Sequence, residues 1–143
     1  MSSYEFETHE QGPPSREGEL VAPVFEDGRS NCGKGEWVCE HRRALLVGAV
    51  QFRKAVAGAE QVTNWWTNGS NQIAFGRDNK GFVAINLSDQ NLQVELPTSL
   101  PAGTYCDRLS TEECFEVNVL AQGNVSLDIP PLDAIAIDVL SKK

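Results

Sequence analysis

The stretch Asn64–Asp89, "NWWTNGSNQIAFGRDNKGFVAINLSD", decides the fold class because large apolar residues recur at every second position. Ile73 and Phe75, for example, alternate with small or polar neighbours. Alternation with a period of two is typical of a β-strand, whose successive side chains point to opposite faces of a sheet. The turn-forming run Arg77–Gly81 interrupts the pattern. The stretch therefore predicts two strands joined by a turn, with the alternating apolar residues Ile73, Phe75, Val83, Ile85 and Leu87.

The same alternation continues to the C-terminus, with turn residues between the segments. Short alternating strands at regular spacing predict an antiparallel β-sandwich or barrel. The alternating residues are Leu92, Val94, Leu96; Phe115, Val117, Val119; Val125, Leu127, Ile129; and Ile135, Ile137, Val139.

The segment before this β-region has helical periodicity. Within Glu40–Ala57, apolar residues recur at helical spacing, and Gly58 provides a stop. The stripe consists of Leu45, Ala49, Phe52 and Val56, widened by Leu46 and Val50. A helix with so wide an apolar face is expected to pack on other structure. Residues 1–35 are rich in Gly, Pro, Ser and charge, which indicates loop or linker.

Two of the three tryptophans are adjacent, at Trp65 and Trp66. Adjacent tryptophans are consistent with a platform that stacks on the CH faces of sugars, and also with the bulky start of a buried strand. Because neighbours in an extended strand point to opposite faces, both rings cannot lie in the same core. One outward ring remains a candidate sugar contact.

Composition narrows the class of protein. The 143 residues fit one ordinary domain, and 41% hydrophobic residues are enough for a core. The net charge of −8 argues against nonspecific binding to nucleic acid or anionic lipid. No apolar run reaches the roughly 20 residues of a membrane-spanning helix. The N-terminus has no basic-then-apolar signal peptide, so the signal of a secreted protein would lie outside this chain.

The cysteines and the glycosylation motifs both favour an oxidising, secretory compartment. The cysteine spacings are unlike those of zinc sites, and they predict two short-loop disulfides. The predicted pairs are Cys32 with Cys39 and Cys106 with Cys114. Three N-x-S sequons begin at Asn68, Asn86 and Asn124.

Two of the sequons are expected to project a glycan into solvent. Asn86 alternates out of register with Val83, Ile85 and Leu87, and Asn124 begins a strand at a turn. If the apolar residues face the core, Asn86 faces solvent.

No catalytic motif stands out. The only histidines are His9, in a predicted loop, and His41, beside a cysteine at a helix start. We interpret both as structural rather than nucleophile-activating. A glycosidase needs two carboxyl groups held about 5 to 9.5 Å apart across a cleft. The carboxylates here, such as Glu112, Glu113 and Glu116, are interpreted as a solvated surface. We therefore assign no catalytic and no metal-binding residue.

Several ordered blocks resemble the C-terminal part of animal-type, chloride-dependent α-amylases of glycoside hydrolase family 13. The resemblance covers nearly the whole chain. Its blocks are "MSSY" (Met1–Tyr4), "GPP" (Gly12–Pro14), "WVCEHR" (Trp37–Arg42), "NWWTNGSNQIAFGR" (Asn64–Arg77), "GF" (Gly81–Phe82), "LPAGTYCD" (Leu100–Asp107) and "AIAIDV" (Ala134–Val139).

This resemblance implies two parts. Residues 1–58 would be the last loop and helix of a catalytic (β/α)8 barrel, and residues 59–143 a C-terminal, antiparallel Greek-key β-sandwich. The family's catalytic carboxylates and its calcium and chloride ligands would lie upstream, at positions without a match here. The expected function is the structural, inactive C-terminal segment of a secreted α-amylase, without cofactors of its own. Its expected partners are the barrel and, through an exposed tryptophan, starch or another α-glucan.

The sequence departs from the family at several positions. Arg43 stands where the family usually has tryptophan, Glu5–Glu7 replaces an aromatic-rich run, and the Cys106–Cys114 loop is short. These departures affect packing against the barrel more than the sandwich. The alternative function is a free-standing carbohydrate-binding or decoy module. A complete small enzyme is the third hypothesis, and the lack of a recognisable site argues against it.

Overall fold

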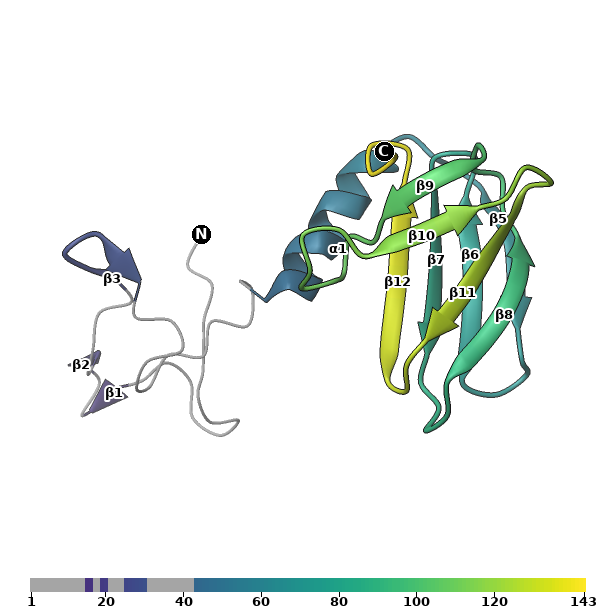
Figure 1. Cartoon of the computed structure of the whole chain (residues 1–143). Helices are drawn as coiled ribbons and strands as arrows, with labels where there is room; N and C mark the ends of the chain where they lie inside the picture. Colours follow the sequence, from purple (N-terminus) through teal and green to yellow (C-terminus); the bar gives the residue numbers. More distant parts are fainter. Residues whose placement is uncertain (1–14, 17–18, 21–24, 31–42) are drawn as a thin grey trace.

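The computed structural model describes residues 15–16, 19–20, 25–30 and 43–143 (Figure 1). In the segment predicted to be loop, it contains two short hairpins: β1 (Ser15–Arg16) with β2 (Glu19–Leu20), and β3 (Phe25–Glu26) with β4 (Arg29–Ser30). The turn between β3 and β4 is Asp27-Gly28, and both residues have positive φ, at 48° and 71°. An Asp-Gly pair suits such a two-residue hairpin turn.

The remaining strands form two four-stranded antiparallel sheets (Figure 1). The first sheet has the order β12-β7-β6-β5, and the second has the order β8-β11-β10-β9. In the second sheet, β9, β10 and β11 are consecutive hairpin neighbours and β8 lies beside β11, which is a Greek-key arrangement. The strands are β5 (Val62–Thr67), β6 (Gln72–Arg77), β7 (Gly81–Asn86), β8 (Leu92–Pro97), β9 (Gly103–Cys106), β10 (Glu116–Val119), β11 (Asn124–Ile129) and β12 (Asp133–Asp138).

The inner faces of both sheets contribute to one hydrophobic core. Trp66 and Val94 pack against it from partly buried positions. Tyr105 is fully buried, and its hydroxyl donates to the backbone oxygen of Pro101 at 2.6 Å. The predicted mainly β, sandwich-like fold class is therefore confirmed. The buried members of the core are Ala74, Phe82, Ala84, Leu92, Leu96, Leu100, Tyr105, Val117, Val119, Val125, Leu127, Ile129, Ile135 and Ile137.

The face of β7 that enters the core is opposite to the one we predicted. Phe82, Ala84 and Asn86 are buried, whereas the expected inward residues Val83 and Ile85 are only half-buried. The strand is central in its sheet and apolar on both faces, so alternation cannot identify the inner one. The expectation that Asn86 faces solvent is therefore wrong.

Strand β9 was not predicted, because its sequence Gly-Thr-Tyr-Cys has no apolar alternation. The strand is fixed by pairing with β10, in which Tyr105 lies opposite Val117. A non-local partner thus gives strand structure to a segment whose own sequence indicates a turn.

Helix α1 (Ala44–Ala55) lies within the predicted range 40–57 and alongside β12 (Figure 1). Gly58 follows the helix with φ of 74°, as expected for its stop signal. Two glycines permit the close packing of α1. A Cβ atom on Gly48 would overlap the backbone oxygen of Arg108, and one on Gly81 would lie 2.7 Å from the ring of Phe52. The helix therefore contacts the sandwich at Gly48, its smallest residue, and through the ring of Phe52.

We predict that Gly48→Ala destabilises the protein by about 1–3 kcal/mol, because the added methyl meets backbone rather than a movable side chain. At an exposed helical position the same change would stabilise the protein by about 1 kcal/mol. Urea denaturation followed by circular dichroism measures the difference, with Val47→Ala on the exposed side as the control. An increase in stability would show that α1 is not docked as described.

Candidate functional site

The side of α1 that faces away from the sandwich is apolar and exposed. Phe52 is half-buried and Val56 is buried, while four large apolar side chains remain 41–57% exposed. Leu45 and Val47 border hollows that the segment after β9 also lines, whereas Leu46 and Val50 lie on the side of the helix opposite to Gly48. Leu46 and Val50 form the outward stripe of α1. A helix that is apolar on opposite sides is suited to lie between two packed bodies.

The adjacent tryptophans point in opposite directions. Trp66 lies opposite Ala74 in the sheet and packs against the core. Trp65 is 60% exposed, and its ring stacks on Phe75 with a centroid separation of 6.1 Å and an interplanar angle of 23°. The pairing register of β5 with β6 shifts between Thr63 and Trp66, as at a β-bulge. Trp65 is thus an exposed ring supported from behind by a second aromatic residue.

A hollow of ≈ 350 Å³ lies beside the supporting ring, between α1 and β6. Arg77 is held in place because its guanidinium donates to the backbone oxygen of Ala59 at 2.6 Å. The hollow combines aromatic faces with guanidinium donors, a chemistry that suits sugar hydroxyl groups. It is lined by Phe52, Arg53, Val56, Phe75 and Arg77.

The three sequon asparagines have different environments. Asn68 is exposed in the turn between β5 and β6. Asn124 is half-buried at the start of β11, where its amide donates to Glu95 at 2.7 Å. Asn86 is fully buried, in contrast to our prediction.

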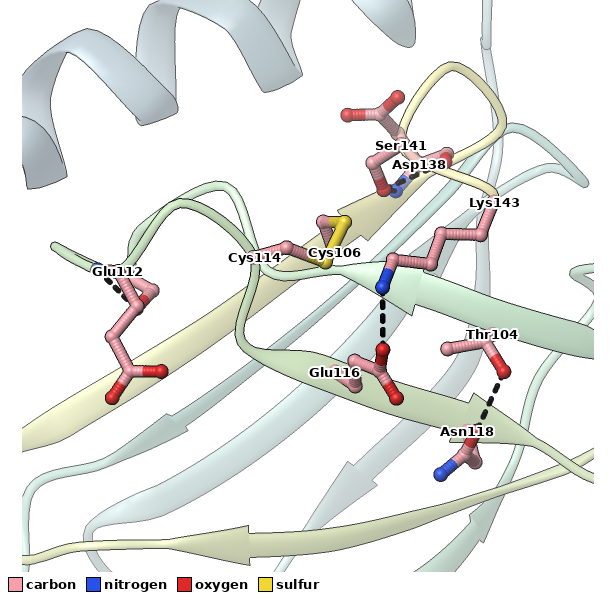
Figure 2. Close-up of a disulfide and its surroundings, with 10 residues drawn as sticks. Thr104, Cys106, Glu112, Cys114, Glu116, Asn118, Asp138, Ser141 and Lys143 are labelled. Atoms are coloured by element: carbon pink, nitrogen blue, oxygen red, sulfur yellow. Dashed lines mark hydrogen bonds and ion pairs between the residues drawn. A yellow bond between two sulfur atoms is a disulfide. The ribbon is translucent and has the colours of Figure 1, made fainter.

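A disulfide joins Cys106 to Cys114 and closes a short loop beside the C-terminal residues (Figure 2). Cys106 belongs to β9, and its backbone N–H donates to the oxygen of Ser141 at 2.8 Å. Near the disulfide, the Lys143 ammonium pairs with Glu116 of β10 (Figure 2). Cys32 and Cys39, the other predicted pair, lie outside the described residues.

The closed loop carries a polar network that ties it to β12. Arg108 forms a two-pronged ion pair with the buried Asp138, at 2.8 and 3.1 Å. Asp107 accepts hydrogen bonds from the backbone N–H groups of Ala136 and Leu109. Burial raises the pKa of Asp107 and outweighs these hydrogen bonds, which favour the charged form. Nearby Asp133 adds a like charge that also raises the pKa.

Asp107 of this network lines a pocket of ≈ 660 Å³ between the start of α1 and the sandwich. Its wall mixes the carboxyls of Asp107, Asp128 and Asp133 with the apolar side chains of Leu45 and Phe115. Within residues 43–143 and the short hairpins, no group of three or more metal-binding side chains comes together. The same part of the chain contains no helix long and apolar enough to cross a membrane. His9 and His41 lie outside the described residues.

A family model supports the architecture. The model described as "Alpha amylase, C-terminal all-beta domain" matches residues 65–139, which run from Trp65 in β5 to just beyond β12. This range is more than half of the 143-residue chain.

Curated proteins and solved structures are similar over more of the chain. An α-amylase of Hypothenemus hampei is 47% identical over 111 residues, covering 77% of this chain and 22% of the relative. An α-amylase-related protein of Drosophila willistoni is 47% identical over 129 residues, covering 87% and 26%. The structure of α-amylase I from Eisenia fetida matches with a TM-score of 0.75 and 36% identity, over 90% of this chain and 27% of that one. The chain thus spans about a quarter of the length of these relatives.

The environment of Asp107 predicts a pH dependence. Because the folded-state pKa is raised above the unfolded value, folding favours the protonated form. The contribution to stability is largest below the unfolded pKa and is lost as the pH rises through the folded pKa. We expect wild type to gain stability relative to Asp107→Asn as the pH falls from 7 toward about 4. Urea midpoints measured across that range provide the test, with Asp128→Asn as the exposed control. A difference that is constant, or grows in the opposite direction, would contradict the assigned cause.

Proposed function

The chain belongs to the family of the α-amylase C-terminal all-beta domain, and from this premise we propose that it forms the C-terminal part of an α-amylase. In this proposal residues 59–143 are the all-β domain. Residues 1–58, which contain α1, are the last loop and helix of the catalytic barrel. The substrate of the complete enzyme would be an α-1,4-glucan such as starch, and the protein would be secreted. The disulfide between Cys106 and Cys114 supports secretion, since disulfides persist in oxidising compartments.

The observation that carries the proposal is the outward stripe of α1. Its side chains, Leu46 and Val50, are 41% and 57% exposed on a helix whose other side packs on the sandwich. A barrel helix needs this arrangement, because it packs on barrel strands on one side and contacts the C-terminal domain on the other. The chain matches only about a quarter of the length of these relatives, so the remaining three quarters of such a protein could cover the outward stripe.

The division of labour follows from the chemistry of retaining glycoside hydrolysis. That reaction needs a carboxylate nucleophile and a second carboxyl group as acid and base. We propose that both groups, and the ligands for calcium and chloride, belong to the upstream part of such a protein. The present chain would contribute stability and anchor the last barrel helix. Alone, it should not cleave starch.

A chimera tests the proposal: this chain replaces the matching segment of the Eisenia fetida α-amylase I. We expect the chimera to fold and to hydrolyse starch. Adding Leu46→Lys and Val50→Lys should then lower the thermal midpoint, because burying two such side chains contributes roughly 3–6 kcal/mol. Two lysines on the exposed outer face of the second sheet, Gln93→Lys and Ser126→Lys, are the matched control.

Two results would contradict the proposal. In the first, the lysines in the outward stripe have no more effect than the control pair in an active chimera. In the second, the purified chain cleaves starch by itself.

The exposed ring of Trp65 favours a second function, binding of an α-glucan at the surface. This function would serve an amylase that acts on granules, and it would equally serve a free-standing carbohydrate-binding or decoy module. Phe75 stacks on one face of the Trp65 ring, so the other face remains available for stacking on glucose units. The donors of Arg53 and Arg77 in the adjoining hollow are within the same surface region.

Trp65→Ala should weaken binding of the chain to insoluble starch by about 3–10-fold, the range expected for loss of one stacking contact. Sedimentation of the protein with starch granules measures the change. Phe115→Ala, which removes another exposed aromatic ring, is the control and should leave binding unchanged. Equal losses in both variants, or none in Trp65→Ala, would contradict a site at Trp65.

A further inference from the structure

The buried sequon residue Asn86 has no capacity left for modification. Its side chain is 0% exposed. Its Oδ1 accepts hydrogen bonds from Gln72 and from both the backbone N–H and the hydroxyl of Ser88. Its Nδ2 donates to the backbone oxygens of Gln90, Ile129 and Pro130, at 2.8, 3.0 and 2.9 Å. Both amide hydrogens are therefore committed to backbone acceptors, and substituting the nitrogen would remove at least one of these hydrogen bonds.

Two of these acceptors lie at the end of a strand in the other sheet. Ile129 ends β11 of the second sheet, Pro130 follows it, and Asn86 ends β7 of the first sheet. The Asn86 side chain thus joins the two sheets at the ends of β7 and β11. A sugar on its nitrogen would have to occupy the space between the layers, so the layers could not close.

Asn68 has the opposite properties. It lies in the exposed turn between β5 and β6, and its Oδ1 accepts from the backbone N–H groups of Ser70 and Gln72 at 2.9 and 3.1 Å. Its Nδ2 makes one contact, a 2.9 Å hydrogen bond to the side chain of Gln72. Glycosylation replaces one of two amide hydrogens, so the other can keep this contact. The turn geometry depends on the oxygen, which glycosylation leaves unchanged.

We propose that Asn68 carries an N-linked glycan and that a glycan on Asn86 is incompatible with the folded domain. In the reaction, Asn68 Nδ2 forms a bond to the anomeric carbon of an oligosaccharide and loses a proton. The bond from that carbon to the diphosphate of a lipid-linked donor breaks, and the lipid diphosphate leaves. The inference rests on the proposed passage through the secretory pathway. Its consequence is that every molecule glycosylated at Asn86 before folding is lost from the folded population.

The test compares single-sequon variants of the full chain, directed into the secretory pathway of animal cells by a cleavable leader. One variant, Ser88→Ala with Asn124→Gln, keeps only the Asn68 sequon. The other, Asn68→Gln with Asn124→Gln, keeps only the Asn86 sequon. Limited trypsin digestion separates the folded, resistant β-domain from unfolded chains in both secreted and retained material. Peptide mapping of each fraction then locates the glycans.

We expect the resistant fraction of the first variant to carry a glycan on Asn68, and that of the second to carry none. Glycan on Asn86 should be confined to the trypsin-sensitive fraction. A resistant domain with a glycan on Asn86, or a resistant domain never modified at Asn68, would overturn the proposal. Because the leader supplies the pathway and no starch is involved, a failure here is distinguishable from failure of the amylase assignment.

Discussion

Helix α1 can pack only one of its sides against the sandwich, and this constraint decides which of its apolar side chains stay exposed. The side that docks is fixed by Gly48, where the backbones of α1 and Arg108 meet without an intervening side chain. Docking at so small a residue leaves the large residues Leu46 and Val50 on the opposite side of the helix. Their exposure is therefore a consequence of how α1 is held. In the proposed α-amylase, the barrel would cover them.

The sandwich itself is closed by a polar contact as well as by apolar burial. Asn86 stands among buried apolar residues, and its hydrogen bonds join β7 to the end of β11. A buried amide is tolerated when every donor and acceptor is satisfied, and it then fixes one arrangement of the two layers. The loop closed by the Cys106–Cys114 disulfide is likewise joined to β12, by the ion pair between Arg108 and Asp138. The Asn86 hydrogen bonds and the Arg108–Asp138 ion pair thus fix the sandwich that positions α1 and Trp65.

Sequence reasoning found most strands because their apolar alternation is local information. It assigned the wrong face to β7, since a central strand with Val83 on one side and Phe82 on the other has no polar face to mark solvent. It overlooked β9, which exists through pairing with β10. It correctly required Trp65 and Trp66 to diverge, a consequence of strand geometry alone. The choice of which ring is buried depends on Ala74 across the strand pair, and so did not follow from spacing.

Amide hydrogen exchange on the isolated 143-residue chain tests the central claim most directly. If the outward stripe of α1 normally packs against a barrel, the helix has lost part of its burial and should open more readily than the sheet. The account predicts faster exchange in residues 44–55 than in residues 72–96, together with self-association through the stripe. Uniformly slow exchange across both regions, in a protein shown to be monomeric, would contradict it. That result would instead support an independent module.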